Sequence, residues 1–236
     1  MNVWSYWQGP MPEYIKICIE TMKNKCKNFT LLTPKNIGDY IYNSPLDIDK
    51  CRRLNNPAHL ADVYRVAVIF NHGGLWLDCD TIMINPLDNF KQIVSPFNDG
   101  FFHSRWNDGR VLNGYFYATK GNAVIEEWLL AINQILKKVS IRNSWTLFGE
   151  KILTPIVNRV DSNTIEISRT IFLPINIDKI PWVFFEPYHW STFVSYDTVA
   201  IGLNNSWFRD TVPEFVNSIE PWKGNGLIHQ LLNEMR

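Results

Sequence analysis

Two closely spaced acidic side chains are the strongest candidates for chemistry in this sequence. Asp78 and Asp80 flank Cys79 and follow a short apolar run, Leu75 to Leu77. In extended backbone the two carboxylates would share one side and repel each other unless a cation or a proton relieves them. Mg²⁺ and Mn²⁺ are commonly held by one or two carboxylates together with substrate phosphate oxygens. The motif predicts a site for a divalent ion and a nucleotide diphosphate; the alternative is a polar turn after a strand.

A pair of opposite charges precedes this motif. Asp62 and Arg65 lie three residues apart, which places them on one face of a helix, off its apolar stripe. They could form a surface ion pair, which would contribute little to stability. Alternatively, they could grip sugar hydroxyls and phosphate near the ligand-binding edge of a sheet.

The elements that would position these groups alternate between strand and helix. We predict a strand at Val3 to Trp7, a helix at Glu13 to Lys27 and a strand at Phe29 to Leu32. This order predicts a mostly parallel central sheet flanked by helices.

The segment before the acidic motif carries start and stop signals. Asn56 is predicted to cap a helix that begins at Pro57. Gly73-Gly74 ends it, with one glycine in the left-handed conformation. The strand Leu75 to Leu77 would then deliver the carboxylates to the carboxyl end of the sheet, where open α/β sheets bind ligands.

The second half has weaker patterns. We expect a hairpin turned at Asn107-Asp108-Gly109 and, near Pro155, the start or interruption of a helix. The predicted ranges are a hairpin at Phe101 to Ala118, helices at Asn122 to Val139, Phe148 to Val160 and Leu227 to Met235, and strands at Ile165 to Ile175, Trp182 to Phe185 and Val199 to Leu203.

Composition bounds the class of protein. The 236 residues, 46% of them hydrophobic, suit one globular domain over 1–236. The 23 basic residues balance 23 acidic ones, which argues against nucleic acid as a partner. Aromatic residues make up 14%, with 10 Trp, which fits either a carbohydrate enzyme or ordinary packing.

Targeting signals and cysteines bear on location. We find no signal-peptide pattern and no window with the roughly 20 apolar residues of a membrane span. Four cysteines without CxxC spacing favour free thiols in a reducing compartment. We therefore expect a cytoplasmic protein that can still contact a membrane peripherally.

Two runs make the pattern specific: Asn56-Pro57-Ala58-His59-Leu60-Ala61-Asp62-Val63-Tyr64-Arg65 and His72-Gly73-Gly74-Leu75-Trp76-Leu77-Asp78-Cys79-Asp80. They resemble the DXD-containing sugar-binding-region glycosyltransferases, which include capsular polysaccharide synthesis proteins and the fungal initiating mannosyltransferases. The opening Val3-Trp4-Ser5-Tyr6-Trp7-Gln8-Gly9 and the stretch Cys18 to Met22 resemble the capsular branch. The likeness is strongest over about the first 90 residues.

The resemblance implies a GT-A fold and a retaining transfer from a nucleotide sugar, with UDP favoured, to a glycan or lipid-linked glycan. It assigns Asp78 to donor ribose or metal and Asp80 to the metal, Mn²⁺ or Mg²⁺. It assigns Asp62 and Arg65 to donor-sugar hydroxyls and places Val3, Trp4 and Tyr6 at the nucleoside. Asn113 would be either a turn residue or a polar contact to the sugar.

The chain departs from the family near its end. Relatives often supply a metal-binding His shortly before a Ser-Trp pair, whereas this chain has Asn204-Asn205-Ser206-Trp207. Any of Asn204, Asn205 and Ser206 offers an oxygen ligand instead, as non-His groups do in the related large clostridial toxin glucosyltransferases. His189 is a candidate for acceptor binding or for packing.

No protein nucleophile is evident, and Glu150 and Glu186 are weak candidates near the anomeric carbon.

One alternative function is a phosphatase of the haloacid dehalogenase type, because Asp78-Cys79-Asp80-Thr81 matches its Asp-x-Asp-x-Thr signature with Asp78 as nucleophile. No downstream acidic pair completes that signature. Another alternative is a sugar-binding module without catalysis.

Overall fold

The computed structural model describes residues 1–97, 99–138, 146–160, 164–176, 178 and 181–236. The chain forms two compact units built from interleaved segments. Unit 1 takes residues 1–8, 30–77 and 94–167, and unit 2 takes residues 9–29, 78–93 and 168–236. Each unit has its own architecture.

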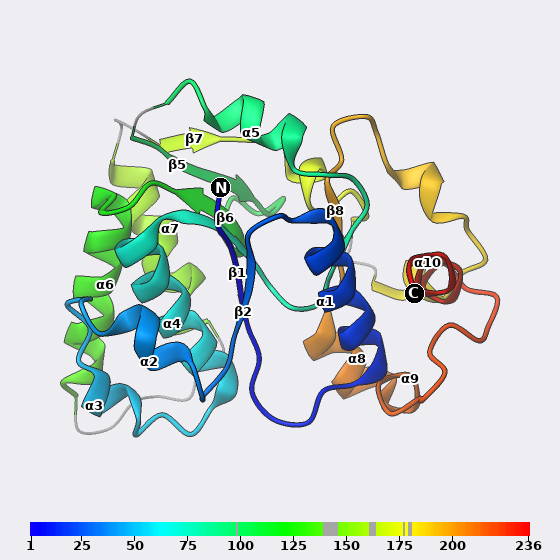
Figure 1. Cartoon of the computed structure of the whole chain (residues 1–236), viewed down its shortest axis with the longest axis horizontal. Helices are drawn as coiled ribbons and strands as arrows, with labels where there is room; N and C mark the ends of the chain where they lie inside the picture. Colours follow the sequence, from blue (N-terminus) through cyan, green and yellow to red (C-terminus); the bar gives the residue numbers. More distant parts are fainter. Residues whose placement is uncertain (98, 139–145, 161–163, 177, 179–180) are drawn as a thin grey trace. The chain divides into compact units, whose positions relative to one another are not determined.

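A six-stranded sheet forms the frame of unit 1, in the order β2-β1-β3-β6-β5-β7 (Figure 1). The strands are β1 (Val3–Tyr6), β2 (Phe29–Leu32), β3 (Gly74–Leu77), β5 (Phe101–Arg105), β6 (Val111–Ala118) and β7 (Thr164–Glu166). The pairs β1–β3 and β5–β7 are parallel, and β6 runs antiparallel between β3 and β5. Four strands therefore share one direction, β1, β3, β5 and β7, which confirms the predicted α/β class with a mostly parallel sheet.

Helices cover one face of this sheet (Figure 1). They are α2 (Ile37–Ile41), α3 (Ile48–Cys51), α4 (Pro57–His72), α6 (Ala123–Leu136) and α7 (Glu150–Arg159). Side chains that alternate along the strands, among them Trp4, Trp76 and Phe116, pack against α4 and α6 in one apolar core. Helix α4 is buried along most of its length. Its polar side chains therefore need hydrogen-bond or charge partners inside the protein.

The start and stop signals of α4 are confirmed. The Asn56 side chain accepts a hydrogen bond from Ala58 N, and Pro57 is the first helical residue. Gly73 and Gly74 both have positive φ, 63° and 114°. A Cβ on Gly74 would lie 2.5 Å from the Asn2 carbonyl oxygen, so backbone crowding as well as conformation requires glycine there.

Unit 2 is smaller and contains a two-stranded antiparallel sheet, β4 (Thr81–Met83) with β8 (Ala200–Gly202). Helix α1 (Glu13–Lys25) packs against β4, where the Thr21 hydroxyl accepts a hydrogen bond from Met83 N at 2.9 Å. The remaining helices are α5 (Asp88–Val94), α8 (Asn205–Thr211), α9 (Pro213–Val216) and α10 (Leu227–Met235).

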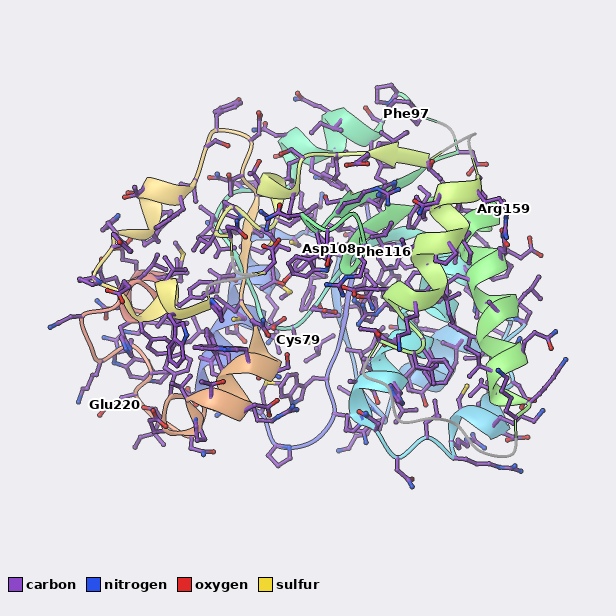
Figure 2. The ribbon with its side chains drawn as sticks, turned by 180° about the vertical axis from the view of Figure 1, so that it is seen from behind. Cys79, Phe97, Asp108, Phe116, Arg159 and Glu220 are labelled. Atoms are coloured by element: carbon purple, nitrogen blue, oxygen red, sulfur yellow. The ribbon has the colours of Figure 1, made fainter. Side chains whose placement is uncertain are left out.

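Several predicted ranges are confirmed with adjusted ends. The hairpin, whose tip carries Asp108 (Figure 2), is present as β5 and β6, and α10 matches its prediction. Asn122 caps α6, and Val139, its predicted last residue, lies outside the described residues. Helix α7 starts at Glu150 and continues through Pro155.

Two predicted strands are wrong. Trp182 to Phe185 belongs to a 3₁₀ helix over Pro181–Phe185, whose proline fixes a helix-compatible φ at the first position. Of the strand predicted at Ile165 to Ile175, only Ile165 and Glu166 lie in β7. The Ser168 side chain then accepts a hydrogen bond from Thr170 N and starts a 3₁₀ turn over Arg169–Ile171.

We expect the two units to unfold in one transition. Neither can form from a contiguous segment, because the chain passes between them after Gln8, Phe29, Leu77, Ile93 and Ile167. Urea unfolding followed by tryptophan fluorescence and by far-UV circular dichroism should therefore give coincident curves. Two separated transitions would contradict the prediction of a single domain over 1–236.

A buried histidine predicts a pH dependence of stability. His103 is 2% exposed, and burial, then the charge of Arg105, lowers its pKa to about 4. Below about pH 6.5 the unfolded chain takes up a proton that the folded protein refuses until about pH 4. Stability should therefore fall by about 2 kcal/mol from pH 7 to pH 5 through this group alone.

The matched comparison is His103→Gln, which removes the titrating ring. Urea unfolding at pH 7 and at pH 5 should show a smaller pH-dependent loss in the variant than in the wild type. An equal loss in both proteins would show that His103 does not cause it.

Candidate functional site

The Asp78-Cys79-Asp80 motif lies in a turn. Strand β3 ends at Leu77, Cys79 and Asp80 form the turn, and β4 begins at Thr81. The Thr81 hydroxyl donates to the Asp78 carbonyl oxygen at 2.6 Å and closes it. The extended geometry assumed from the sequence is therefore wrong, and a tight turn sets the directions of the two carboxylates. Both aspartates are half-buried, and Cys79, which is labelled in Figure 2, is buried.

Asp80 is anchored by a segment far along the chain in unit 2. Its carboxylate Oδ2 accepts a hydrogen bond from Asn205 N at 2.8 Å. Its carbonyl oxygen accepts a second one from Leu203 N, also at 2.8 Å. Since both donors follow β8 directly, the β4–β8 pairing fixes the carboxylate in direction as well as in place.

Tyr14 of α1 supports the same contact from the other side. Its hydroxyl donates to the Asn205 side-chain oxygen. Burial, followed by the negative charge of Asp80, raises the pKa of Tyr14. The phenol therefore stays protonated and keeps its role as a donor, which orients the Asn205 amide. Nothing in the sequence around Tyr14 signalled this role.

The three candidate ligands after β8 differ in their contacts. The Asn204 side-chain oxygen accepts bonds from Trp207 N and from the Ser206 hydroxyl, at 3.1 and 2.9 Å. Those two bonds use both of its lone pairs, so Asn204 acts as the cap of α8. The Asn205 oxygen accepts one bond, and the Ser206 hydroxyl donates in its bond, so each retains acceptor capacity.

The donor set has the chemistry of a hard-cation site. Carboxylate, amide and hydroxyl oxygens from Asp78, Asp80, Asn205 and Ser206 are ligand types that Mg²⁺ and Mn²⁺ accept. Within the described ranges there is no group of three or more His, Cys, Asp and Glu that could hold a metal. Neutral protein oxygens, water or substrate phosphate could supply further ligands.

Unit 1 brings Asp62, Arg65 and Asn113 together. Arg65 Nη2 and Asp62 Oδ1 lie 3.1 Å apart, and their side chains are 5% and 8% exposed. The Asn113 amide donates to Asp62 Oδ1 at 2.9 Å, and its carbonyl accepts from Arg65. The surface ion pair considered from the sequence is thus excluded, since the pair is buried and hydrogen-bonded. Asn113 lies within β6, not in a turn.

Two further residues shape this cluster and were missed from the sequence. The Arg65 guanidinium lies over the Trp76 ring, 5.3 Å from its centroid, in a cation–π contact. Gly149 backs the cluster, because a Cβ there would lie 2.1 Å from the Asn113 amide nitrogen. The only sequence feature that could have pointed to Gly149 is its position as a glycine directly before Glu150, at the start of a helix.

The β1 residues predicted to line a nucleoside pocket are all buried. The Trp4 indole donates to the Gly73 carbonyl at 2.9 Å, and its ring packs against Tyr40. These contacts give Trp4 a place in the core. The Tyr6 hydroxyl donates to the Gln8 side chain at 2.7 Å. Val3 faces away from the core cluster that contains Trp4 and Tyr6.

Three other candidates also have partners. Glu150 is buried and accepts bonds from the Trp106 indole at 2.6 Å and from Arg110 at 2.5 Å, which tie α7 to the β5–β6 hairpin. His189 is exposed; its Nε2 lies 3.3 Å from the Glu234 carboxylate on α10, and its ring stacks on Trp190. Glu186 is exposed, and its backbone carbonyl accepts from Leu227 N.

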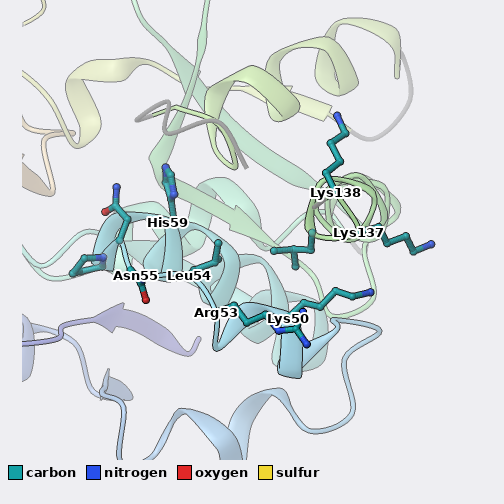
Figure 3. Close-up of a pocket in the computed structure, with 10 residues that line it drawn as sticks. Lys50, Arg53, Leu54, Asn55, His59, Lys137 and Lys138 are labelled. Atoms are coloured by element: carbon teal, nitrogen blue, oxygen red, sulfur yellow. The ribbon is translucent and has the colours of Figure 1, made fainter. Parts of the chain in front are cut away.

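A separate cavity of about 860 Å³ lies in unit 1. Lys50, Arg53, His59, Lys137 and Lys138 are among its lining residues. Figure 3 shows the side chains of Lys137 and Lys138 directed away from each other, so these cations do not converge on one point. None of the residues predicted for donor or metal binding lines this cavity.

The fold is that of the GT-A glycosyltransferases. One similar solved structure is a glycosyltransferase named PaToxG, with a TM-score of 0.51 and 17% identity over 66% of this chain and 67% of that chain. Another is the galactosyltransferase LgtC in complex with donor and acceptor sugar analogues, with a TM-score of 0.47 and 11% identity over 100% of this chain and 95% of that chain.

The sequence matches the family described as capsular polysaccharide synthesis protein over residues 1–170, and the chain belongs to that family. Family and fold together support a glycosyltransferase. No curated protein matches the chain. Among the described helices, none is long and apolar enough to cross a membrane.

The buried Arg65 cluster predicts an asymmetric mutational response. Arg65→Lys should lower the free energy of unfolding by about 1–3 kcal/mol, because a compact ammonium lacks the planar fork whose two terminal nitrogens reach the Asp62 carboxylate and the Asn113 backbone carbonyl separately. The matched control is Arg52→Lys, since Arg52 pairs with Asp49 on the surface, at 73% and 87% exposure. That change should cost less than about 0.5 kcal/mol.

Urea unfolding of both variants measures the difference. Equally small effects would contradict a structural role for the buried pair.

Proposed function

We propose that this protein is a retaining, metal-dependent glycosyltransferase that uses a nucleotide diphosphate sugar, with UDP as the favoured nucleotide. The anchored Asp80 carboxylate is the observation that carries the proposal. A carboxylate fixed by Asn205 N–H after β8 is arranged in advance, so little reorganisation accompanies ligand binding.

Four residues would hold the divalent ion, Mn²⁺ or Mg²⁺. Asp78 and Asp80 supply carboxylates, with Asn205 and Ser206 as the neutral oxygen donors; Asn204 is assigned to capping. When bound, such an ion neutralises negative charge on a leaving diphosphate. Alternatively, the Asp78 carboxylate binds the ribose of the donor and does not bind the metal.

Unit 1 is proposed to bind the donor sugar and nucleoside. Asp62 and Asn113 offer oxygen and amide groups for sugar hydroxyls, and Arg65 adds a cation that its partners hold in one orientation. Tyr6 is the β1 side chain proposed to contact the nucleoside, because its aromatic ring ends in a hydroxyl group that can form hydrogen bonds. A panel that contains hexose and pentose donors distinguishes a hexosyltransferase from a pentosyltransferase.

The reaction exchanges one bond of the anomeric carbon for another on the same face of the sugar. The C1–O bond to the diphosphate breaks, and a C1–O bond to the acceptor hydroxyl oxygen forms. The acceptor proton passes to the departing diphosphate oxygen, so no protein base is required. Glu150 is assigned to hairpin packing, since Trp106 and Arg110 already bind its carboxylate.

The acceptor is proposed to be a glycan or lipid-linked glycan, which fits a family of capsular polysaccharide synthesis proteins. A cytoplasmic location with peripheral membrane contact accompanies this proposal. The free thiols of Cys18, Cys26, Cys51 and Cys79 agree with a reducing compartment.

The decisive experiment measures donor hydrolysis over a panel of UDP- and GDP-sugars with Mn²⁺, with Mg²⁺ and with EDTA. We expect metal-dependent hydrolysis of one donor class by the wild type. Asp80→Asn should lower it by roughly 100-fold or more, because the charge is lost while an oxygen remains for Asn205 N–H. Asp49→Asn, an exposed acid on α3, is the matched control and should keep full activity.

Each alternative gives its own result. Donor hydrolysis that persists in EDTA and in Asp80→Asn would contradict the metal-dependent mechanism. Phosphate release from phosphate monoesters, with a phosphorylated Asp78, would identify the phosphatase. Glycan binding without any donor turnover would identify the sugar-binding module.

A further inference from the structure

An exposed tryptophan lies beside the segment that anchors Asp80. Trp182, in the 3₁₀ helix Pro181–Phe185 of unit 2, is 52% exposed. Its ring stands edge-on to Trp207 of α8, with centroids 4.7 Å apart and an interplanar angle of 89°. A large aromatic ring that is half in water while held by a second ring presents a stiff apolar face to a ligand.

Trp207 belongs to α8, the helix whose first residue, Asn205, contacts the acidic turn of the same unit. It lies two residues beyond Asn205, about 3 Å along a helix axis, and Asn205 N–H donates to the Asp80 carboxylate. Phe185 packs on Trp207 at 6.2 Å and on Phe208 at 5.6 Å, which fixes the neighbouring rings. The exposed Trp182 ring is therefore held at a set position relative to Asp80.

We propose that Trp182 is the stacking platform for a sugar ring of the acceptor glycan. This inference rests on the proposed glycosyltransferase function and adds the residue that selects the acceptor. The apolar C–H face of a pyranose matches an aromatic face in size and polarity. A diphosphate does not match it, because a charged and strongly hydrated group gains nothing from an apolar surface. A sugar ring of the acceptor glycan presents such a C–H face and is the partner that fits.

This assignment replaces His189 as the acceptor contact. The His189 imidazole and the Trp190 indole both engage the Glu234 carboxylate and join the 3₁₀ helix Trp190–Phe193 to α10. Trp182 is about half exposed while its ring is held against Trp207, and stacking requires both features.

The test uses an array of defined oligosaccharides at high surface density, so that weak binding is scored through avidity. The protein is applied without nucleotide, and again with UDP and Mn²⁺. We expect the wild type to bind a subset of glycans in both conditions. Trp182→Ala should lose at least tenfold of that signal, and Trp182→Phe should recover part of it because a ring is restored. Tyr196→Ala, which removes an 83% exposed aromatic side chain, is the control and should bind like the wild type.

Donor binding is measured in parallel by the shift in thermal unfolding with UDP and Mn²⁺, which should be the same in wild type and Trp182→Ala. Absence of glycan binding by the wild type, or full binding by Trp182→Ala, would overturn the platform. Glycan binding that depends on Trp182 in a protein without a UDP–Mn²⁺ shift would overturn the proposed function and leave the platform standing.

Discussion

A buried guanidinium imposes the strongest constraint on the unit that carries the main sheet. Arg65 is 4% exposed on a helix that is otherwise packed into an apolar core. A charge in such a place is tolerated only when it is paired and hydrogen-bonded. Asp62, the Asn113 carbonyl and the Trp76 ring supply those contacts from α4, β6 and β3. The cluster therefore fixes one helix to two neighbouring strands.

Hydrogen bonds from distant residues also hold the acidic side chain of the Asp78-Cys79-Asp80 turn. Asp80 receives two hydrogen bonds from residues that follow β8, and Tyr14 secures the amide of Asn205. The segment after β8 is thus rich in oxygen-bearing side chains, and its backbone N–H groups hold the aspartate. Asn204 caps the helix, which leaves Asn205 and Ser206 better suited to a metal. Neutral ligands suit a cation that also binds a diphosphate, because the substrate brings the missing negative charge.

Local sequence signals predicted the structure most accurately in the segment from Asn56 to Asp80. A cap, a proline at the first helical turn and a glycine pair act within a few residues, so they can be recognised without knowledge of the fold. They failed at Trp182 to Phe185, where an apolar run with β propensity became a 3₁₀ helix led by Pro181. They also misjudged the burial of Asp62 and Arg65, because helical spacing tells which residues share a face but not what covers that face.

The sequence by itself determined the α/β class, the bounds of α4 and the acidic motif at the end of β3. Short-range chemistry controls all three: hydrophobic periodicity, capping and the spacing of two carboxylates. Only the tertiary structure decided that Asn205 reaches Asp80 across 125 residues, that Asn113 completes the Asp62–Arg65 pair, and that Trp4 is a core residue. Those contacts join segments distant along the chain, and their formation depends on strand order and helix packing, which no local pattern encodes.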